Sequence, residues 1–163
     1  MKPLMEQRPV DRNFEEYDQV YRNSKNSYIL LIAVPLMMFG VMALIWAIPF
    51  PHIAFLGKYN GYLNWASFLI AALIYYHLRL SPMVSYLLLF MLFGFSYGII
   101  QFEQAEKAGG MQLWLAGLVL ATFGIGLQIS IFNTAKATGA FNLLKNSSTW
   151  FLVTVLKAIK LKY

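Results

Sequence analysis

Four long stretches of this chain contain no Asp, Glu, Lys or Arg. They cover residues 28–50, 62–78, 83–102 and 111–132 and consist mainly of aliphatic and aromatic residues. A helix of roughly 20 apolar residues is long enough to cross the hydrocarbon core of a bilayer. Only 12% of the 163 residues are charged, compared with about a quarter in an ordinary soluble domain. We therefore expect an all-α membrane protein, built as a bundle of about four transmembrane helices.

The segments on either side of this bundle differ from it in composition. Residues 1–27 are polar and contain five acidic residues, so they lack the basic start and apolar centre of a signal peptide. Asn13 is a candidate helix cap with Glu16 three residues later, and Phe14 and Tyr17 recur at helical spacing. We expect a cytoplasmic amphipathic helix before the bundle of residues 28–132.

Residues 133–163 form the third segment. Their apolar run extends only over residues 150–156, which is too short to cross a bilayer, and Lys157, Lys160 and Lys162 follow it. This pattern predicts a basic amphipathic tail that lies in the membrane interface.

The distribution of basic residues predicts the topology. Five Lys or Arg precede the first apolar stretch and five follow the last one, whereas each connection between stretches contains one. Since cytoplasmic segments are enriched in Lys and Arg, both termini are expected in the cytoplasm, for a multi-pass protein of the bacterial cytoplasmic (inner) membrane. The charge does not form a patch with interleaved aromatic residues, which favours anionic lipids over nucleic acid as its partner.

Residues that could support catalysis are few. The chain has no Cys, and its two His residues, His52 and His77, are expected on opposite sides of the bilayer. They could not then hold one ion together, and we predict no metal, no cofactor and no catalytic residue. The apolar stretches also lack the ionisable residues of a proton or ion pathway, which argues against a pump.

Four polar residues near the predicted cytoplasmic ends of the stretches are candidates for binding a lipid headgroup: Asn26, His77, Arg79 and Gln128. A guanidinium such as that of Arg79 offers paired donors to a carboxylate or phosphate. Simpler explanations stand beside this one. His77 is also typical of an aromatic belt at the membrane interface, and an Arg at the position of Arg79 commonly extends its side chain to the headgroups. Gln128 is also typical of a residue that forms a hydrogen bond between helices.

Glycines in the last two stretches predict close helix packing. Gly94 and Gly98 have the small-xxx-small spacing that lets helix backbones approach each other in lipid. The last stretch contains three more candidates for such contacts: Gly117, Gly124 and Gly126.

Several motifs, in order, resemble one known family. They are Tyr17 followed by Asn23, Asn26 and Pro35; the run Trp46-Ala-Ile-Pro-Phe-Pro; Leu63-Asn64-Trp65; Tyr75-Tyr76 with Leu78-Arg79-Leu80-Ser81; and Gln128. In this order and spacing, over about residues 14–150, they resemble the small integral membrane proteins related to the fungal dioxygenase that shortens 2-hydroxy fatty acids in phytosphingosine breakdown.

The resemblance implies an Fe(II) dioxygenase with His ligands near the cytoplasmic ends of the first and last spans. The corresponding positions here are Tyr21, Leu30 and Phe132, and a Glu and a Pro expected further on correspond to Lys136 and Ala140. None of the three can supply an imidazole. The chain therefore resembles a degenerate member of the family that lacks the His ligands.

Two functions follow as hypotheses. The first is a non-catalytic membrane protein that acts as a scaffold or accessory subunit and that could bind lipid. Its expected partners are membrane lipids and either another protein or a second copy of itself. The alternative is a lipid enzyme similar to the Fe(II)-dependent 2-hydroxy fatty acid dioxygenase.

Overall fold

All regular secondary structure in the described part of the chain is helical. A computed structural model describes residues 8–21, 27–55, 57, 63–131 and 140–163. These residues contain six α-helices and no strand. The α-helices are α1 (Pro9–Tyr21), α2 (Leu30–Trp46), α3 (Trp65–Leu80), α4 (Pro82–Lys107), α5 (Leu113–Ile131) and α6 (Ala140–Ala158), and the short 3-10 helix η2 (Ser27–Ile29) leads into α2. The all-helical fold class is thus confirmed.

Local sequence signals set several helix boundaries. The Asn64 side chain accepts a hydrogen bond from the Ser67 amide at 3.0 Å, and the Ser67 hydroxyl accepts one from the Asn64 amide at 3.3 Å. This reciprocal capping fixes the start of α3. Pro82 is the first residue of α4, where its missing N–H costs no helical hydrogen bond. The same proline separates α3 from α4 at Ser81.

The predicted cap of the first helix was wrong. Helix α1 begins at Pro9, so Asn13 lies inside it. A proline at the first helical position and an acidic residue, Asp11, in the first turn are favourable start signals that the prediction overlooked. The Asn13 side chain instead donates a hydrogen bond to the Tyr76 hydroxyl at 3.1 Å, which ties α1 to α3.

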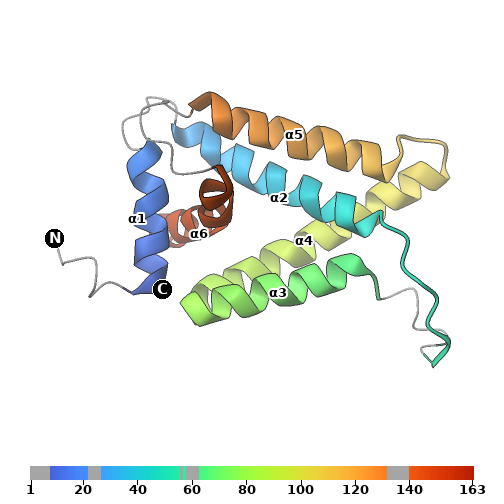
Figure 1. The fold of residues 1–163 in the computed structure, drawn as a ribbon, viewed down its shortest axis with the longest axis horizontal. Coiled ribbons are helices and arrows are strands. Elements are labelled where there is room, and N and C mark those ends of the chain that lie inside the picture. Colours follow the sequence, from blue (N-terminus) through green and yellow to red (C-terminus); the bar gives the residue numbers. More distant parts are fainter. Residues whose placement is uncertain (1–7, 22–26, 56, 58–62, 132–139) are drawn as a thin grey trace.

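The four central helices form two antiparallel pairs. Helices α2 and α5 lie side by side, as do α3 and α4, and the two pairs diverge toward the end of the bundle that holds α1 and α6 (Figure 1). Helix α2 begins at this end, α3 and α5 finish there, and α4 starts there. The C-terminus of the chain also lies on this side.

Glycines bring α2 and α5 into backbone contact. A Cβ atom added at Gly124 would lie 2.6 Å from the Met37 backbone nitrogen, and one added at Gly117 would lie 3.0 Å from the Leu44 nitrogen. Gly40 on α2, which the sequence reasoning missed, faces the backbone of Ala121 in the same way. Only glycine fits such close approaches.

The other glycines of the predicted set have different surroundings. An added Cβ at Gly98 would meet the Phe39 ring at 3.1 Å, so this residue faces α2. Gly94 and Gly126 face open space, with no atom within 4 Å of an added Cβ.

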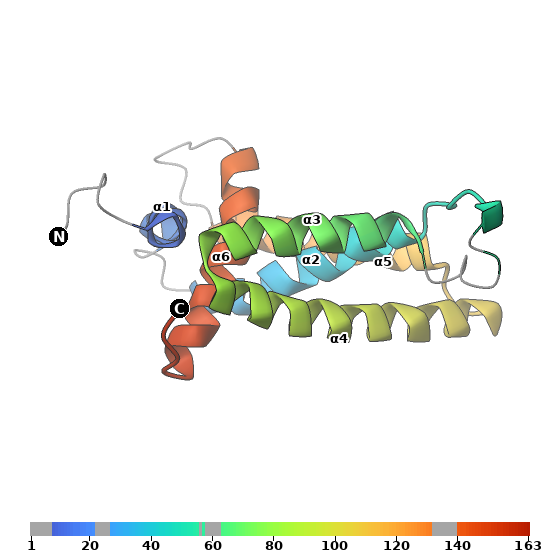
Figure 2. The same cartoon turned by 90° about the horizontal axis from the view of Figure 1, so that it is seen from below.

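Helix α6 fills the space between the diverging pairs. It crosses the end of the bundle at a steep angle, with α1 beside it (Figure 2). Its residues Leu152, Val153 and Leu156 belong to the main hydrophobic core. Asn146, Ser147, Ser148 and Thr149 are also buried. Helix α6 therefore packs into the bundle, with its short apolar run toward the core of the protein. Its position at the membrane interface, which the sequence predicts, stays a prediction.

Helix α1 is held on α6 by polar and aromatic contacts. The Trp150 indole donates a hydrogen bond to the Asp18 carboxylate at 3.1 Å, and its ring packs on Tyr17 with centroids 5.5 Å apart. The Lys157 ammonium lies 3.5 Å from the centroid of the Phe14 ring, a close cation–π contact.

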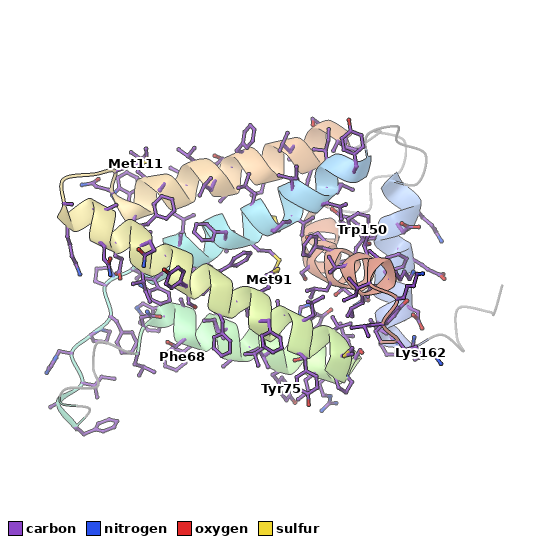
Figure 3. The ribbon with its side chains drawn as sticks, turned by 180° about the vertical axis from the view of Figure 1, so that it is seen from behind. Phe68, Tyr75, Met91, Met111, Trp150 and Lys162 are labelled. Atoms are coloured by element: carbon purple, nitrogen blue, oxygen red, sulfur yellow. The ribbon has the colours of Figure 1, made fainter. Side chains whose placement is uncertain are left out.

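Two helices, α4 and α5, are long and apolar enough to cross a membrane, and α2 and α3 are shorter apolar helices. Large apolar side chains cover the outside of the bundle. Phe68 and Tyr75 lie on the outer edge of the α3 and α4 pair (Figure 3), and Phe90 and Phe123 are more than half exposed.

Candidate functional site

A largely apolar cavity of about 330 Å³ lies between α2, α3, α4 and α6. Its volume is at the lower end of the range of ligand pockets, about 300–1,000 Å³. Three of its lining residues, Tyr76, His77 and Ser148, carry polar side-chain groups, and no lining residue in the described part of the chain carries a formal charge. The apolar lining is formed by Met37, Met38, Val41, Met42, Leu69, Leu73 and Leu92. Such a wall suits a hydrocarbon group.

His77 is the best-fixed polar group of the cavity. It lies in the last turn of α3, and its side chain is fully buried. Its Nδ1 lies 2.8 Å from the Leu73 carbonyl oxygen, one helical turn earlier. Because a carbonyl oxygen can only accept, we assign a proton to Nδ1, and in the neutral ring Nε2 is then an acceptor.

Ser148 completes the polar end of the cavity. Its Oγ lies 3.3 Å from His77 Nε2, and with the tautomer assigned above the serine hydroxyl donates to the ring. Ser148 reaches this position because the polar turn Asn146–Thr149 of α6 is buried on all sides within the bundle. Asn146 on the same run donates to the Glu16 carboxylate of α1 at 3.1 Å.

A serine and a histidine in this arrangement resemble the nucleophile and base of a hydrolase. Hydrolases also need backbone or side-chain donors that stabilise an oxyanion. Ser148 lies in the middle of α6, so the adjacent backbone N–H groups are used in helical hydrogen bonds. The pair is therefore better suited to holding a polar group than to acyl transfer.

A second buried polar contact adjoins the cavity. The Tyr17 hydroxyl of α1 donates to Gln128 Oε1 of α5 at 3.0 Å. The Gln128 amide in turn lies 3.3 Å from the sulfur of Met37, a residue of the cavity wall. Tyr17 is fully buried and Gln128 is 4% exposed, so this hydrogen bond fixes α1 and α5 against one side of the cavity.

The four predicted headgroup residues have separate positions. His77 lines the cavity, and Gln128 is buried next to it through Met37. Arg79 is exposed and outside the cavity lining, with its guanidinium 3.4 Å from the Tyr75 hydroxyl and 6.0 Å from the centroid of that ring. Successive positions on a helix point about 100° apart, so Arg79 cannot share the buried face of His77. Asn26 lies outside the described residues.

The sequence reasoning missed Ser148, Tyr17, Tyr76 and Met37. The signal for Ser148 was a run of four polar residues, 146–149, directly before an apolar run in a helical segment. Such a run in a membrane protein indicates a helix face buried against other polar groups. For Met37 the signal was the residue type, because methionine is frequent in adaptable binding surfaces.

The iron site implied by the family resemblance does not fit these residues. Within the described ranges no three His, Cys, Asp or Glu side chains come together in a way that could hold a metal ion. Leu30, at one of the implied ligand positions, is buried in a hydrophobic cluster with Tyr17 and Trp150. We therefore derive no step through iron.

A second pocket, of about 570 Å³, lies at the opposite end of the bundle. It contains Glu103 and Glu106, together with Trp46 and Trp114. Glu106 accepts a hydrogen bond from the Leu113 amide at 3.1 Å. This carboxylate thereby caps the start of α5, which gives it a structural role.

No family model, curated protein or solved structure matches this chain. The functional argument consequently depends on the cavity and on the surface of the bundle.

Proposed function

We propose that this chain is a non-catalytic, multi-pass membrane protein that binds one hydrocarbon chain of a lipid in the cavity between α2, α3, α4 and α6. The observation that carries the proposal is an uncharged methionine- and leucine-lined cavity that ends on the buried His77–Ser148 pair. A lipid has the same two parts, an apolar chain and a polar end.

The proposal includes four membrane crossings, by α2, α3, α4 and α5. Length and composition alone would also fit the core helices of a soluble protein. The surface argues for lipid instead, because large apolar side chains such as Phe90 (72% exposed) and Phe123 (58% exposed) point outward while His77 and Gln128 are buried. Large contiguous apolar surfaces are rare on soluble monomers. Helices α2 and α3 are close to the minimum length for a crossing.

The topology can be tested by cysteine labelling, since the chain has no cysteine of its own. Single replacements Gln19→Cys and Lys162→Cys lie at the end that holds α1 and α6, and His52→Cys and Lys107→Cys lie at the other. With cytoplasmic termini, as the basic residues predict, an impermeant maleimide should label only the second pair in intact cells. Labelling of Gln19→Cys and Lys162→Cys from opposite sides would exclude an even number of crossings.

Lipid binding can be tested by filling the cavity. Leu69 lines it, whereas its neighbour Phe68 is exposed on the outer surface. The protein is purified in mild detergent and its bound lipids are measured by native mass spectrometry. Leu69→Trp should lose the bound lipid, and Phe68→Trp should retain it. Equal lipid content in both variants would refute a ligand in this cavity.

A role as an accessory subunit of a membrane complex is the second proposal. On α4, Tyr86, Phe90, Phe93 and Tyr97 are all exposed and recur at helical spacing, so they form one aromatic stripe. Aromatic residues are enriched at protein interfaces. Co-purification in mild detergent, followed by proteomics, should recover a stoichiometric partner or a homo-oligomer. The loss of that partner in Phe90→Ala, but not in Phe123→Ala on α5, would support the stripe as the surface that binds the partner. A purified protein that is monomeric and free of other proteins would exclude this role.

A further inference from the structure

We infer that the second pocket binds a small organic ammonium group, such as that of choline. This pocket lies at the end of the bundle where α2 and α4 finish and α3 and α5 begin (Figure 1). An ammonium group of this kind occurs both in lipid headgroups and in soluble amines. The pocket shares no lining residue with the cavity between α2, α3, α4 and α6, so the inference does not depend on the proposed function.

The pocket combines aromatic rings with carboxylates. Trp46, Phe50 and Trp114 line it together with Glu103 and Glu106. Its volume of about 570 Å³ is typical of pockets that hold small ligands, about 300–1,000 Å³. The face of an aromatic ring attracts cations, most strongly in Trp, and rings gathered around one site bind quaternary ammonium groups. A carboxylate adds a full opposite charge. The lining therefore suits a positively charged ligand with apolar substituents.

Glu103 is the carboxylate that can face a ligand. Glu106 accepts a hydrogen bond from the Leu113 amide, whereas Glu103 makes no hydrogen bond or ion pair with any residue in the described part of the chain. Lys107, one turn after Glu103, is exposed and is not part of the lining. The two glutamates are three positions apart on α4, so they lie on one face and their charges repel each other. A cation bound beside Glu103 would reduce this repulsion.

Contacts on both sides of the pocket hold its walls in place. The Trp65 indole donates a hydrogen bond to the Pro49 carbonyl at 3.2 Å, and its ring packs edge-on against the Phe50 ring with centroids 5.3 Å apart. On the other side, the bond between Glu106 and the Leu113 amide joins the end of α4 to the start of α5. Because these contacts exist without a ligand, little ordering of the protein opposes binding.

A divalent metal ion suits this pocket less well than an organic cation. Ca²⁺ requires about six to eight oxygen ligands and Mg²⁺ an octahedron of them. Within the described residues no three His, Cys, Asp or Glu side chains come together in a way that could hold a metal ion. Ile48, Leu63 and Ile100 also line the pocket. Such side chains can pack against the methyl and methylene groups of an organic cation, and they offer a metal ion no ligand.

The test measures choline binding to the full chain in phosphatidylglycerol vesicles, because this lipid has no ammonium group. Saturation-transfer NMR titrations give the Kd of choline and that of 3,3-dimethylbutan-1-ol, a neutral molecule of the same shape. We expect choline to bind at least about tenfold more tightly, from its contacts with the rings and with Glu103. Equal affinities, or no saturable binding of choline, would overturn the inference.

Variants show whether the pocket itself binds the cation. Glu103→Gln keeps the size of the side chain and removes its charge, so it should weaken choline binding about tenfold and leave the neutral analogue unaffected. Glu15→Gln on α1 removes the same charge at the opposite end of the bundle and is the control. Trp46→Leu should weaken choline binding more than binding of the analogue, and Glu103→Gln keeps the test valid if Trp46→Leu fails to fold. Equal choline affinity in Glu103→Gln and Glu15→Gln would overturn the inference.

Two further variants test other locations and occupants. Leu69→Trp fills the cavity of the proposed function and should bind choline as the wild type does, so a loss of binding in this variant would overturn the inference. Lys58 lies outside the described residues. Choline binding that occurs only in Lys58→Gln would show that a lysine of the chain itself occupies the pocket, which would also overturn the inference.

A last comparison identifies the source of the ammonium group. Phosphatidylcholine is added to the vesicles at increasing fractions while choline binding is measured. Displacement of choline would support a lipid headgroup as the ligand. Unchanged choline binding would support a soluble amine.

Discussion

Tyr17 and Gln128 are 111 residues apart in the sequence, and their side chains share a buried hydrogen bond of 3.0 Å. The bond joins α1 to α5, and through Met37 it reaches the wall of the cavity. The first helix is thereby part of the folded bundle. The stability of the site depends on a residue that lies outside every apolar stretch of the sequence.

Replacing Tyr17 with Phe should destabilise the protein by about 1–3 kcal/mol, because Gln128 Oε1 would remain buried without its donor. The measurement is the thermal unfolding midpoint in mild detergent. Tyr75→Phe is the matched control, since Tyr75 is 63% exposed, and it should leave the midpoint nearly unchanged. Equal effects of the two substitutions would contradict the role of the buried bond.

The close approach of α2 and α5 can be tested with two glycines on one helix. In Gly124→Ala the new methyl group would meet the Met37 backbone nitrogen at 2.6 Å, so the helices must separate. We expect a loss of about 1–3 kcal/mol, as for other overpacked cores. Gly126→Ala faces open space and should be neutral or slightly stabilising, because alanine favours the helix.

Both glycine variants can be compared by resistance to unfolding in sodium dodecyl sulfate. An unchanged midpoint for Gly124→Ala would show that α2 and α5 are further apart in the membrane than described above.

Docking of α1 should depend on Phe14. This ring packs against the main hydrophobic core and against the cluster of Tyr17, Leu30 and Trp150. The Lys157 ammonium lies 3.5 Å from the centroid of the ring. Phe14→Ala removes the apolar contact and the cation–π contact, together worth about 2–4 kcal/mol. We expect trypsin to cleave after Arg12 at least about tenfold faster, since α1 would detach more often.

Gln19→Ala is the control for this experiment, because Gln19 lies on the same helix and is exposed. Similar cleavage rates in wild type and Phe14→Ala would indicate that other contacts hold α1.

The start of α3 should depend on Asn64. Asn64→Ala removes the side-chain oxygen that accepts from the Ser67 amide and should cost about 0.5–2 kcal/mol. Asn64→Asp keeps a side-chain acceptor and should restore most of the loss in a thermal unfolding experiment. If Asn64→Asp were as unstable as Asn64→Ala, the contribution of this residue would not be capping.

Most helices of this protein can be predicted from local signals, which are the absence of charge over long apolar stretches and the Ser81-Pro82 step. The sequence also pointed to His77 and Gln128, since polar groups in apolar helices need buried partners. The sequence did not show that the Arg79 side chain lies on the surface. It does so because Arg79 is two positions after the buried His77 on the same helix.

The contacts of His77, by contrast, depend on the packing of distant segments. Ser148 is 71 residues away from it, and nothing in a local pattern shows that the polar turn of α6 lies between two diverging helix pairs. That placement depends on the glycines Gly40, Gly117 and Gly124, which bring α2 close to α5. It also depends on the short apolar run of α6, which can be buried only in the space between the two helix pairs at the end where they diverge. The boundaries of helices follow from local propensity and hydrophobicity, whereas the partners of buried polar groups follow from packing between distant segments.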